Sequence, residues 1–348
     1  TRAQRLVREL ALVARLTAPY AANPVTTNLI AFAPREPSGW ATASWRDSGA
    51  GYAGGRYAMD INAIWVPHAL ESLGRIMTAM RALGIATATS DTTLARYVRD
   101  SASLTRAIMT WRGASRHFAV QLTAPQVMAA TRARLAAMPT AERDWWTSRS
   151  GAARDTEAPI EFLAVALDAQ GKPLAVANTD AATQLFLGDA EGRTTGSTPE
   201  EVEHTLRDVR LFARPYPVGL FVDRIGPVVA NDAYATPATW DAFVKDPYHG
   251  PRVVWGREVN LFLLGTAGRI ARAQQQSGTG NAAYVAELRA ALEKVRSAVE
   301  QSGFHTELWS YGFTNGRLAA LRYGSGADIQ LWSTTDLAVQ YVLARTLR

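Results

Sequence analysis

The sequence predicts a mainly helical fold, and three observations lead to this prediction. Long stretches of the 348-residue chain repeat apolar side chains at intervals of three and four residues, the spacing of a helix with one buried face. Segments with the apolar runs of strands are short and confined to the middle of the chain. Glycine, proline and tryptophan collect in long segments between the helical stretches, where loops are expected.

The same rules predict where each element begins and ends. Pro67 opens the second helix, because proline is favoured in the first helical turn, and Ser90 or Asp91 caps the third. Prolines from Pro19 to Pro37 and the glycine-rich stretch 49–55 predict a long loop between the first two helices. The predicted helices cover residues 4–17, 67–83, 90–111, 125–138, 180–187, 198–212, 255–275, 281–301 and 335–347, and the predicted β-segments cover residues 117–122, 161–179, 218–222 and 227–230.

Long helices joined by long loops are typical of a helical toroid, in which the loops gather at one end and form the active site. We therefore expect one domain over residues 1–348, an (α/α)6 toroid with inserted β-hairpins. About nine helices are predicted, fewer than the six hairpins of a complete ring require. We expect the ring to be incomplete in this chain, lacking N-terminal helices or an N-terminal domain that a fragment or companion chain would supply.

Composition excludes several classes of protein and site. The net charge is +6, but the basic residues are scattered among acidic neighbours, which predicts a solvated surface and no nucleic-acid partner. The absence of cysteine excludes disulfides, thiolate metal sites and cysteine nucleophiles, and it is compatible with an exported or a cytosolic protein, of which we favour the exported one. No apolar run reaches the ~18 residues that cross a bilayer. The five histidines lack metal-ligand spacing, so we expect no metal and no cofactor.

Three stretches combine carboxylates with tryptophan, tyrosine and arginine beyond what packing requires. The first joins SWRDS at 44–48 to GGRYAMDINAIW at 54–65, the second is DPYHGPRVVWGREVN at 246–260, and the third is HTELWSY at 305–311. Hydrolysis of a glycosidic bond uses this set of groups, because one carboxylic acid protonates the leaving oxygen and one carboxylate activates water. Aromatic rings and arginines then hold the sugar.

The same stretches resemble motifs of known glycosidases. Residues 248–265 (YHGPRVVWGREVNLFLLG) resemble the YRGPVWxxxNxLLLxGL helix of glycoside hydrolase family 63, with His249 in place of arginine and one extra residue before Trp255. SWRDS resembles the loop that carries the general acid in family 63 and in trehalases, and the TWMDA of glycogen-debranching glucosidases. GRYAMDINAIW is similar to their GKPVEINALW. TELWSY, with Asn315, Gly316 and IQLWS at 329–333, resembles the C-terminal segment that holds their general base.

The resemblance implies an inverting glycoside hydrolase that cleaves an α-glycosidic, and more narrowly an α-glucosidic, bond. It implies Asp47 as general acid, protonated in a partly desolvated pocket, and Glu307 as general base, with the two carboxyls about 6.5–9.5 Å apart. It also implies that an oligosaccharide or glycoside substrate is bound by Trp45, Arg46, Tyr57, Asp60, Asn62, Trp65, Tyr248, His249, Trp255, Arg257, Glu258, Trp309, Tyr311 and Trp332.

The residues leave alternatives open. Asp47 also fits a turn cap before the glycine-rich stretch, and Glu307 fits a surface charge. Asp60 is a second candidate for the acid, although substrate binding suits it better, and Glu258 beside Arg257 fits a structural ion pair. At the level of function, the alternatives are a carbohydrate-binding or catalytically inactive toroid subunit, and a sugar epimerase or polysaccharide lyase, whose chemistry uses His, Tyr or Lys bases.

Overall fold

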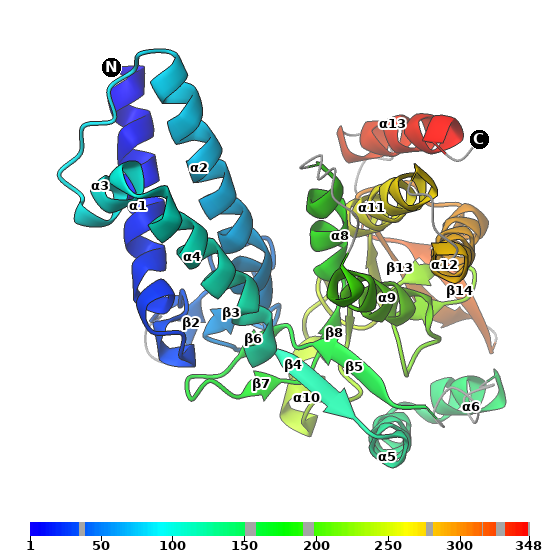
Figure 1. The fold of residues 1–348 in the computed structure, drawn as a ribbon. Helices are drawn as coiled ribbons and strands as arrows, with labels where there is room; N and C mark the ends of the chain where they lie inside the picture. Colours follow the sequence, from blue (N-terminus) through cyan, green and yellow to red (C-terminus); the bar gives the residue numbers. More distant parts are fainter. Residues whose placement is uncertain are drawn as a thin grey trace. The chain divides into compact units, whose positions relative to one another are not determined.

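The computed structural model describes residues 1–34, 39–149, 158–190, 198–275, 281–314, 316–324 and 331–346. Helices dominate, and the strands form small antiparallel sheets (Figure 1), which confirms the prediction of a mainly helical chain. The chain divides into two compact units, residues 1–119 with 165–174 and residues 120–164 with 175–348. No sequence signal predicted this division, because no linker-like segment marks the points where the chain passes from one unit to the other.

In the first unit, helix α1 (Arg2–Ala22) packs against α2 (Val66–Ala82), α3 (Thr92–Arg99) and α4 (Ser101–Arg112). The helix predicted at residues 4–17 is confirmed, but it continues to Ala22, so that Pro19 lies inside it and not in the following loop. Proline inside a helix removes one backbone hydrogen bond, and α1 nevertheless continues for three residues beyond Pro19.

The helix predicted over residues 90–111 is in fact two helices. Asp91 caps α3, as expected, and its carboxylate accepts the N–H of Leu94 at 2.8 Å. Asp100 then adopts an extended backbone with φ −130° and caps α4 by accepting the N–H of Ala102 at 3.0 Å. An aspartate that satisfies a free helical N–H outside the helix competes with helix continuation, which explains the break.

The start of α2 differs from expectation in a way that matters for the site. Proline does occupy its first turn, but a π-helix, η2 (Asp60–Trp65), runs directly into it. Residues 60–65 belong to the first of the three polar stretches. π-Helical turns are rare and often occur at functional sites, because their wider turn redirects the side chains.

Short β-elements complete the first unit. β3 (Tyr57–Ala58) pairs with β6 (Ala166–Leu167), which pairs with β7 (Pro173–Leu174). The hairpin predicted over residues 161–179 is confirmed for its inner part, the pair β6 and β7. The remaining elements of the unit are β1 (Ala33–Pro34), β2 (Trp40–Ala41), η1 (Thr26–Asn28) and η3 (Gly113–His117).

The second unit is built around α11 (Gly256–Gln275), which packs against α8 (Ala181–Ala190), α12 (Asn281–Ser302) and α13 (Leu331–Thr346). The helix predicted over residues 255–275 is confirmed, and Phe262 and Ile270 within it are fully buried. The other helices of this unit are α5 (Ala124–Ala136), α6 (Thr140–Arg149), α9 (Pro199–Ala213) and α10 (Pro237–Val244); α6 and α10 were not predicted.

The strands that the structure describes in the second unit form four small sheets. A three-stranded sheet joins β12 (Val253–Trp255), β13 (Leu308–Thr314) and β14 (Arg317–Arg322), and none of the three was predicted as a strand. The paired strands of the other sheets are β4 (Ala119–Leu122) with β5 (Ile160–Leu163), β8 (Ala177–Asn178) with β11 (Ala230–Asn231), and β9 (Phe221–Val222) with β10 (Gly226–Pro227). In the part of the chain that the structure describes, no helix has the length and hydropathy to cross a membrane.

Candidate functional site

Asp60 connects the two parts of the first polar stretch through hydrogen bonds. It is the first residue of η2 and is only 1% exposed. Its carboxylate accepts hydrogen bonds from the hydroxyl of Ser44 at 3.0 Å and from the hydroxyl of Tyr52 at 3.0 and 3.1 Å. A buried carboxylate requires such donors. Asp60 therefore positions the SWRDS loop, and a role as the catalytic acid does not suit its buried, hydrogen-bonded state.

Asn62 has a structural role and not the sugar-binding role expected of it. Its side chain is fully buried. The amide nitrogen donates to the carbonyls of Ile30 and Ala58 at 3.0 and 2.9 Å, and the amide oxygen accepts the N–H of Ile30 at 2.8 Å. The oxygen and the nitrogen of the amide thus both form hydrogen bonds with the backbone, and neither is directed to a ligand.

The side chains around Asp47 differ in exposure. Arg46 is buried, with its guanidinium 4.3 Å from the ring of half-buried Trp45, and Tyr57 is 1% exposed. Trp65 is 41% exposed, and Asp47 itself is exposed, while its carbonyl oxygen accepts the hydroxyl of Thr42 at 3.0 Å. The partly desolvated pocket expected around Asp47 is therefore not observed, and Tyr57 belongs to the core.

In the second unit, strand pairing joins the second and third polar stretches, which are far apart in the sequence. β12 pairs with β13 so that Trp255 lies opposite Leu308 and Val254 opposite Trp309. The N–H of Gly256 donates to the carbonyl oxygen of Glu307 at 2.7 Å. Half-buried Glu307 is thus fixed against the first residue of α11.

Beside this point lies a group of four rings, Tyr248, His249, Trp255 and Tyr323, which we call the aromatic ledge. The rings of His249 and Trp255 are nearly parallel, at 8° with centroids 5.9 Å apart, and the centroids of Tyr248 and Tyr323 are 5.2 Å apart. Tyr248 is 47% exposed and Trp255 is half-buried. The ledge therefore offers accessible aromatic faces near the residue predicted to be the general base.

Hydrogen bonds hold the ledge in place. The indole N–H of Trp255 donates to the carbonyl of Tyr248 at 2.7 Å. Asp246 accepts the N–H groups of Tyr248 and His249 at 2.8 and 3.1 Å, and it lies 3.1 Å from Nδ1 of His249. Desolvation and a hydrogen bond with Tyr248 raise the pKa of Tyr323 to about 12, so that its hydroxyl stays protonated.

Three other residues expected to bind substrate are parts of the core. Glu258 is 1% exposed and forms an ion pair with Arg257, which confirms the structural alternative for this pair. Trp309 is 1% exposed, and its indole N–H donates to the carbonyl of Ile225 at 2.9 Å. Tyr311 is 3% exposed, and burial raises the pKa of its hydroxyl well above the usual value. None of these buried faces is available to a sugar ring.

The remaining expectations fall outside the described side chains. Trp332 lies in α13, but its side chain is outside the described part of the chain, as are Asn315 and residues 329–330. Among the groups that the structure does describe, no cluster of His, Asp or Glu has the arrangement of a metal site.

The sequence did not indicate Ser44, Tyr52 or Tyr323 as site residues. Tyr52 was part of a stretch treated as a glycine-rich loop, and Tyr323 joins the ledge only through the register of the β13–β14 hairpin, in which Trp309 lies opposite Arg322. Comparison of the chain with family models, with curated proteins and with solved structures finds no match. Geometry and the sequence motifs are therefore what support this site.

Proposed function

We propose that the chain is an inverting glycoside hydrolase acting on an α-glycosidic, and more narrowly an α-glucosidic, bond. The observation that supports the proposal is the pairing of β12 with β13, which brings Glu307 to the head of α11 beside the aromatic ledge. Aromatic faces bind the C–H faces of sugar rings, and a carboxylate beside them is the group that activates water in these enzymes. We also propose that the chain has the (α/α)6 toroid fold.

In this mechanism Glu307 acts as the ionised general base and Asp47 as the general acid. The carboxylate of Glu307 takes a proton from water as the water attacks the anomeric carbon, and Asp47 gives its proton to the leaving oxygen. Asp60 contributes indirectly, since it anchors the loop on which Asp47 lies.

The test uses Asp47→Asn and Glu307→Gln on aryl α-glycosides and α-linked disaccharides. Each change should lower kcat by about 10²–10⁴-fold, the usual contribution of acid–base catalysis. Asp47→Asn should lose far less on dinitrophenyl glycosides, because that leaving group departs without a proton, whereas Glu307→Gln should lose activity on both kinds of substrate. Proton NMR of the first-formed sugar should show the inverted anomer.

Matched controls carry the same chemical change at exposed positions outside the three polar stretches. Asp223→Asn and Glu9→Gln should leave kcat unchanged, since both side chains are exposed. Hydrolysis that persists at the normal rate in both Asp47→Asn and Glu307→Gln would contradict the proposal. A retained anomeric configuration would contradict the inverting mechanism alone.

The exposed state of Asp47 favours one second candidate, a carbohydrate-binding subunit without turnover. In that case the aromatic ledge would bind malto-oligosaccharides and Trp255→Ala would weaken the binding, while no glycoside would be hydrolysed. Equilibrium binding measured together with the hydrolysis assay separates the two functions.

A further inference from the structure

The positive charge of the chain belongs to its first unit. Residues 1–119 and 165–174 hold fifteen arginines and lysines against eight aspartates and glutamates, whereas the second unit holds twenty-two basic residues against twenty-three acidic ones. An excess of positive charge attracts anionic partners wherever it is exposed and not neutralised by nearby carboxylates.

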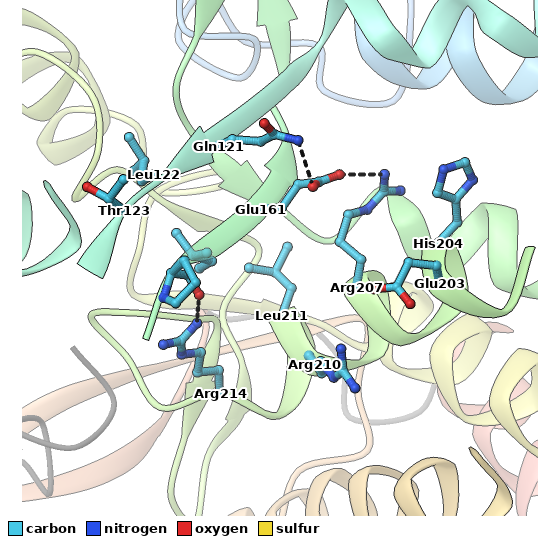
Figure 2. A pocket seen from close by; sticks show the side chains of 12 residues that line it. Gln121, Leu122, Thr123, Glu161, Glu203, His204, Arg207, Arg210, Leu211 and Arg214 are labelled. Carbon is cyan, nitrogen blue, oxygen red and sulfur yellow. Dashed lines mark hydrogen bonds and ion pairs between the residues drawn. The ribbon is translucent and has the colours of Figure 1, made fainter. Parts of the chain in front are cut away.

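Arginines that gather in the second unit are already engaged by their neighbours. A groove of about 590 Å³ lies between α9 and the strands β4 and β5, and three arginines of α9 line it (Figure 2). Arg207 lies 3.6 Å from the carboxylate of Glu161. Arg210 donates twice to Glu287, at 2.6 and 3.0 Å, and Arg214 donates to a backbone carbonyl at 2.9 Å. None of these three arginines is therefore a free cation for an anionic ligand.

The outer face of α1 in the first unit is different. Arg5, Arg8 and Arg15 are exposed, and among the described residues no side chain forms a hydrogen bond or an ion pair with any of these guanidinium groups. α1 contains a single acidic residue, Glu9, which is also exposed and pairs with none of the three. The three positive charges are therefore uncompensated.

Two leucines lie among these arginines. Leu12 is 39% exposed and Leu16 is 49% exposed. Positions 5, 8, 12 and 15, with 16 four residues after 12, are spaced by three or four residues and therefore form one stripe along the helix. We call these five residues the Arg–Leu stripe.

The opposite face of α1 fixes the stripe in place. Leu10, Ala14 and Tyr20 are buried on that face. The indole N–H of Trp111 in α4 donates to the carbonyl of Thr17 at 3.0 Å, which joins the two helices by a buried hydrogen bond. Because the helix is folded and packed before any partner arrives, no ordering of its backbone opposes binding.

The combination of arginine with leucine decides the class of partner. Guanidinium groups donate paired hydrogen bonds to phosphates, which nucleic acids and phospholipids both offer. A nucleic acid would leave Leu12 and Leu16 against a polar backbone, and the exposed positions of α1 carry no aromatic ring that stacks on a base. At an anionic bilayer the leucines enter the boundary between headgroups and acyl chains, while the long arginine side chains reach the phosphates.

We infer that the Arg–Leu stripe of α1 binds the surface of an anionic phospholipid bilayer. Binding is peripheral and reversible, since three charges and two leucines bury far less apolar area than a spanning helix does. The whole stripe contacts the bilayer when α1 lies parallel to its plane. This inference does not depend on the proposed hydrolase function.

Sedimentation of the full chain with lipid vesicles tests the inference. Vesicles of phosphatidylcholine alone are the neutral surface, and vesicles with about a third of phosphatidylglycerol are the anionic one. We expect the anionic vesicles to bind the chain about tenfold or more tightly than the neutral ones, and the difference to shrink as added salt screens the charges. Absence of binding to the anionic vesicles, or equal binding to both kinds, would overturn the inference.

Charge variants locate the binding on α1. The triple variant Arg5→Gln, Arg8→Gln and Arg15→Gln should bind anionic vesicles about 10²-fold more weakly, because each arginine near the surface contributes about fivefold. The matched control removes the same charge from three exposed positions of the second unit, Arg132→Gln, Arg289→Gln and Arg317→Gln. This control should bind like the parent chain, and equal losses in the two triple variants would refute the assignment to α1.

A labelled leucine position tests contact with the apolar part of the bilayer. Because the chain has no cysteine, Leu16→Cys can carry a single environment-sensitive dye such as nitrobenzoxadiazole. Its emission should move to shorter wavelength on anionic vesicles, whereas the same dye at Leu337→Cys, a position 72% exposed on α13, should show no such shift. An unchanged emission at position 16 would show that the stripe does not enter the bilayer, which contradicts the inference.

The leucines also separate a lipid surface from a nucleic acid. Leu12→Gln with Leu16→Gln should weaken binding to anionic vesicles about tenfold, because binding scales with the buried apolar area. Tighter binding of a DNA duplex than of anionic vesicles, unaffected by this double change, would assign the stripe to nucleic acid and refute the lipid surface. Glu307→Gln, which the proposed function makes inactive, should bind vesicles like the parent chain, so a failure of that function would leave this result intact.

Discussion

The backbone N–H of Gly256 donates to the carbonyl oxygen of Glu307 at 2.7 Å, and a Cβ at position 256 would lie 2.3 Å from the carbonyl oxygen of Thr306. No side chain larger than hydrogen fits between the first residue of α11 and the backbone of Thr306 and Glu307. The position of the proposed general base therefore depends on Gly256, which lies in another segment of the chain. The motif at residues 248–265 includes this glycine, but the motif alone gives no reason for it.

Gly256→Ala should displace the start of β13 and weaken its pairing with β12. We expect a loss of about 1–3 kcal/mol in the free energy of unfolding, the usual cost of overpacking, together with a loss of hydrolysis, because Glu307 moves with its backbone. Urea denaturation and the glycosidase assay measure the two effects. The control is Gly74→Ala in α2, where the nearest atom to the new Cβ is the flexible end of Leu104 at 3.1 Å. Equal behaviour of the two variants would show that the close approach at Gly256 is not required.

The hydroxyl of Tyr52 holds the buried carboxylate of Asp60 and, through it, the loop of Asp47. Tyr52→Phe removes one donor from a carboxylate that is 1% exposed and should destabilise the fold by about 1–3 kcal/mol. Urea denaturation measures this cost, and Tyr341→Phe at an exposed position of α13 is the control. If Tyr52→Phe changes stability no more than Tyr341→Phe does, the hydrogen bond to Asp60 has no net role in stability.

The ion pair of Arg134 with Asp232 is buried on both sides and has two hydrogen bonds, at 2.8 and 3.1 Å. Arg134→Met alone should cost about 3–5 kcal/mol, because it leaves a carboxylate buried without its counter-charge. Arg134→Met with Asp232→Leu should cost less than the two single changes added together. Denaturant titrations of the four proteins in this cycle give the coupling.

An exposed pair serves as the reference for that cycle. Arg106 and Asp100 are 3.3 Å apart with most of the arginine side chain in solvent, and such pairs contribute only about 0–1 kcal/mol. A coupling energy for Arg134 and Asp232 no larger than that of Arg106 and Asp100 would contradict the prediction.

Periodicity and capping residues predicted the long helices of this chain, because both signals are local. Residues 281–301 repeat apolar side chains with the helical period, and α9 begins directly after Thr198, at the predicted helix start, where Thr198 forms a capping box with Glu201. The break at Asp100 was not predicted, because an aspartate inside a helical pattern gives no sign that it will leave the helix to cap the next one.

The site was harder to predict, since it depends on which face of an element is buried. In β13, Trp309 and Tyr311 alternate with residues that are more exposed, so the strand buries the two aromatic residues that the motif suggested for substrate. Trp255 is on an adjacent strand and remains accessible. Tyr323 comes beside Tyr248 through the pairing of β14, a long-range relationship that no local pattern indicates.

The pH dependence of stability should include a contribution from His117 in the first unit. Burial, and then the positive charge of Arg116, lower its pKa below 6.5, and Nε2 lies 3.0 Å from the hydroxyl of Tyr20. The unfolded chain then binds a proton more tightly than the folded one. The stability that neutral His117 supplies is therefore fully present above pH 6.5 and is lost as the pH falls through 6.5 toward the lower folded pKa. Thermal unfolding of the parent chain and of His117→Gln, followed by circular dichroism from about pH 7.5 to about pH 5, should show Tm of the parent falling relative to the variant. A Tm difference that stays constant over this range would show that the protonation of His117 is not linked to folding.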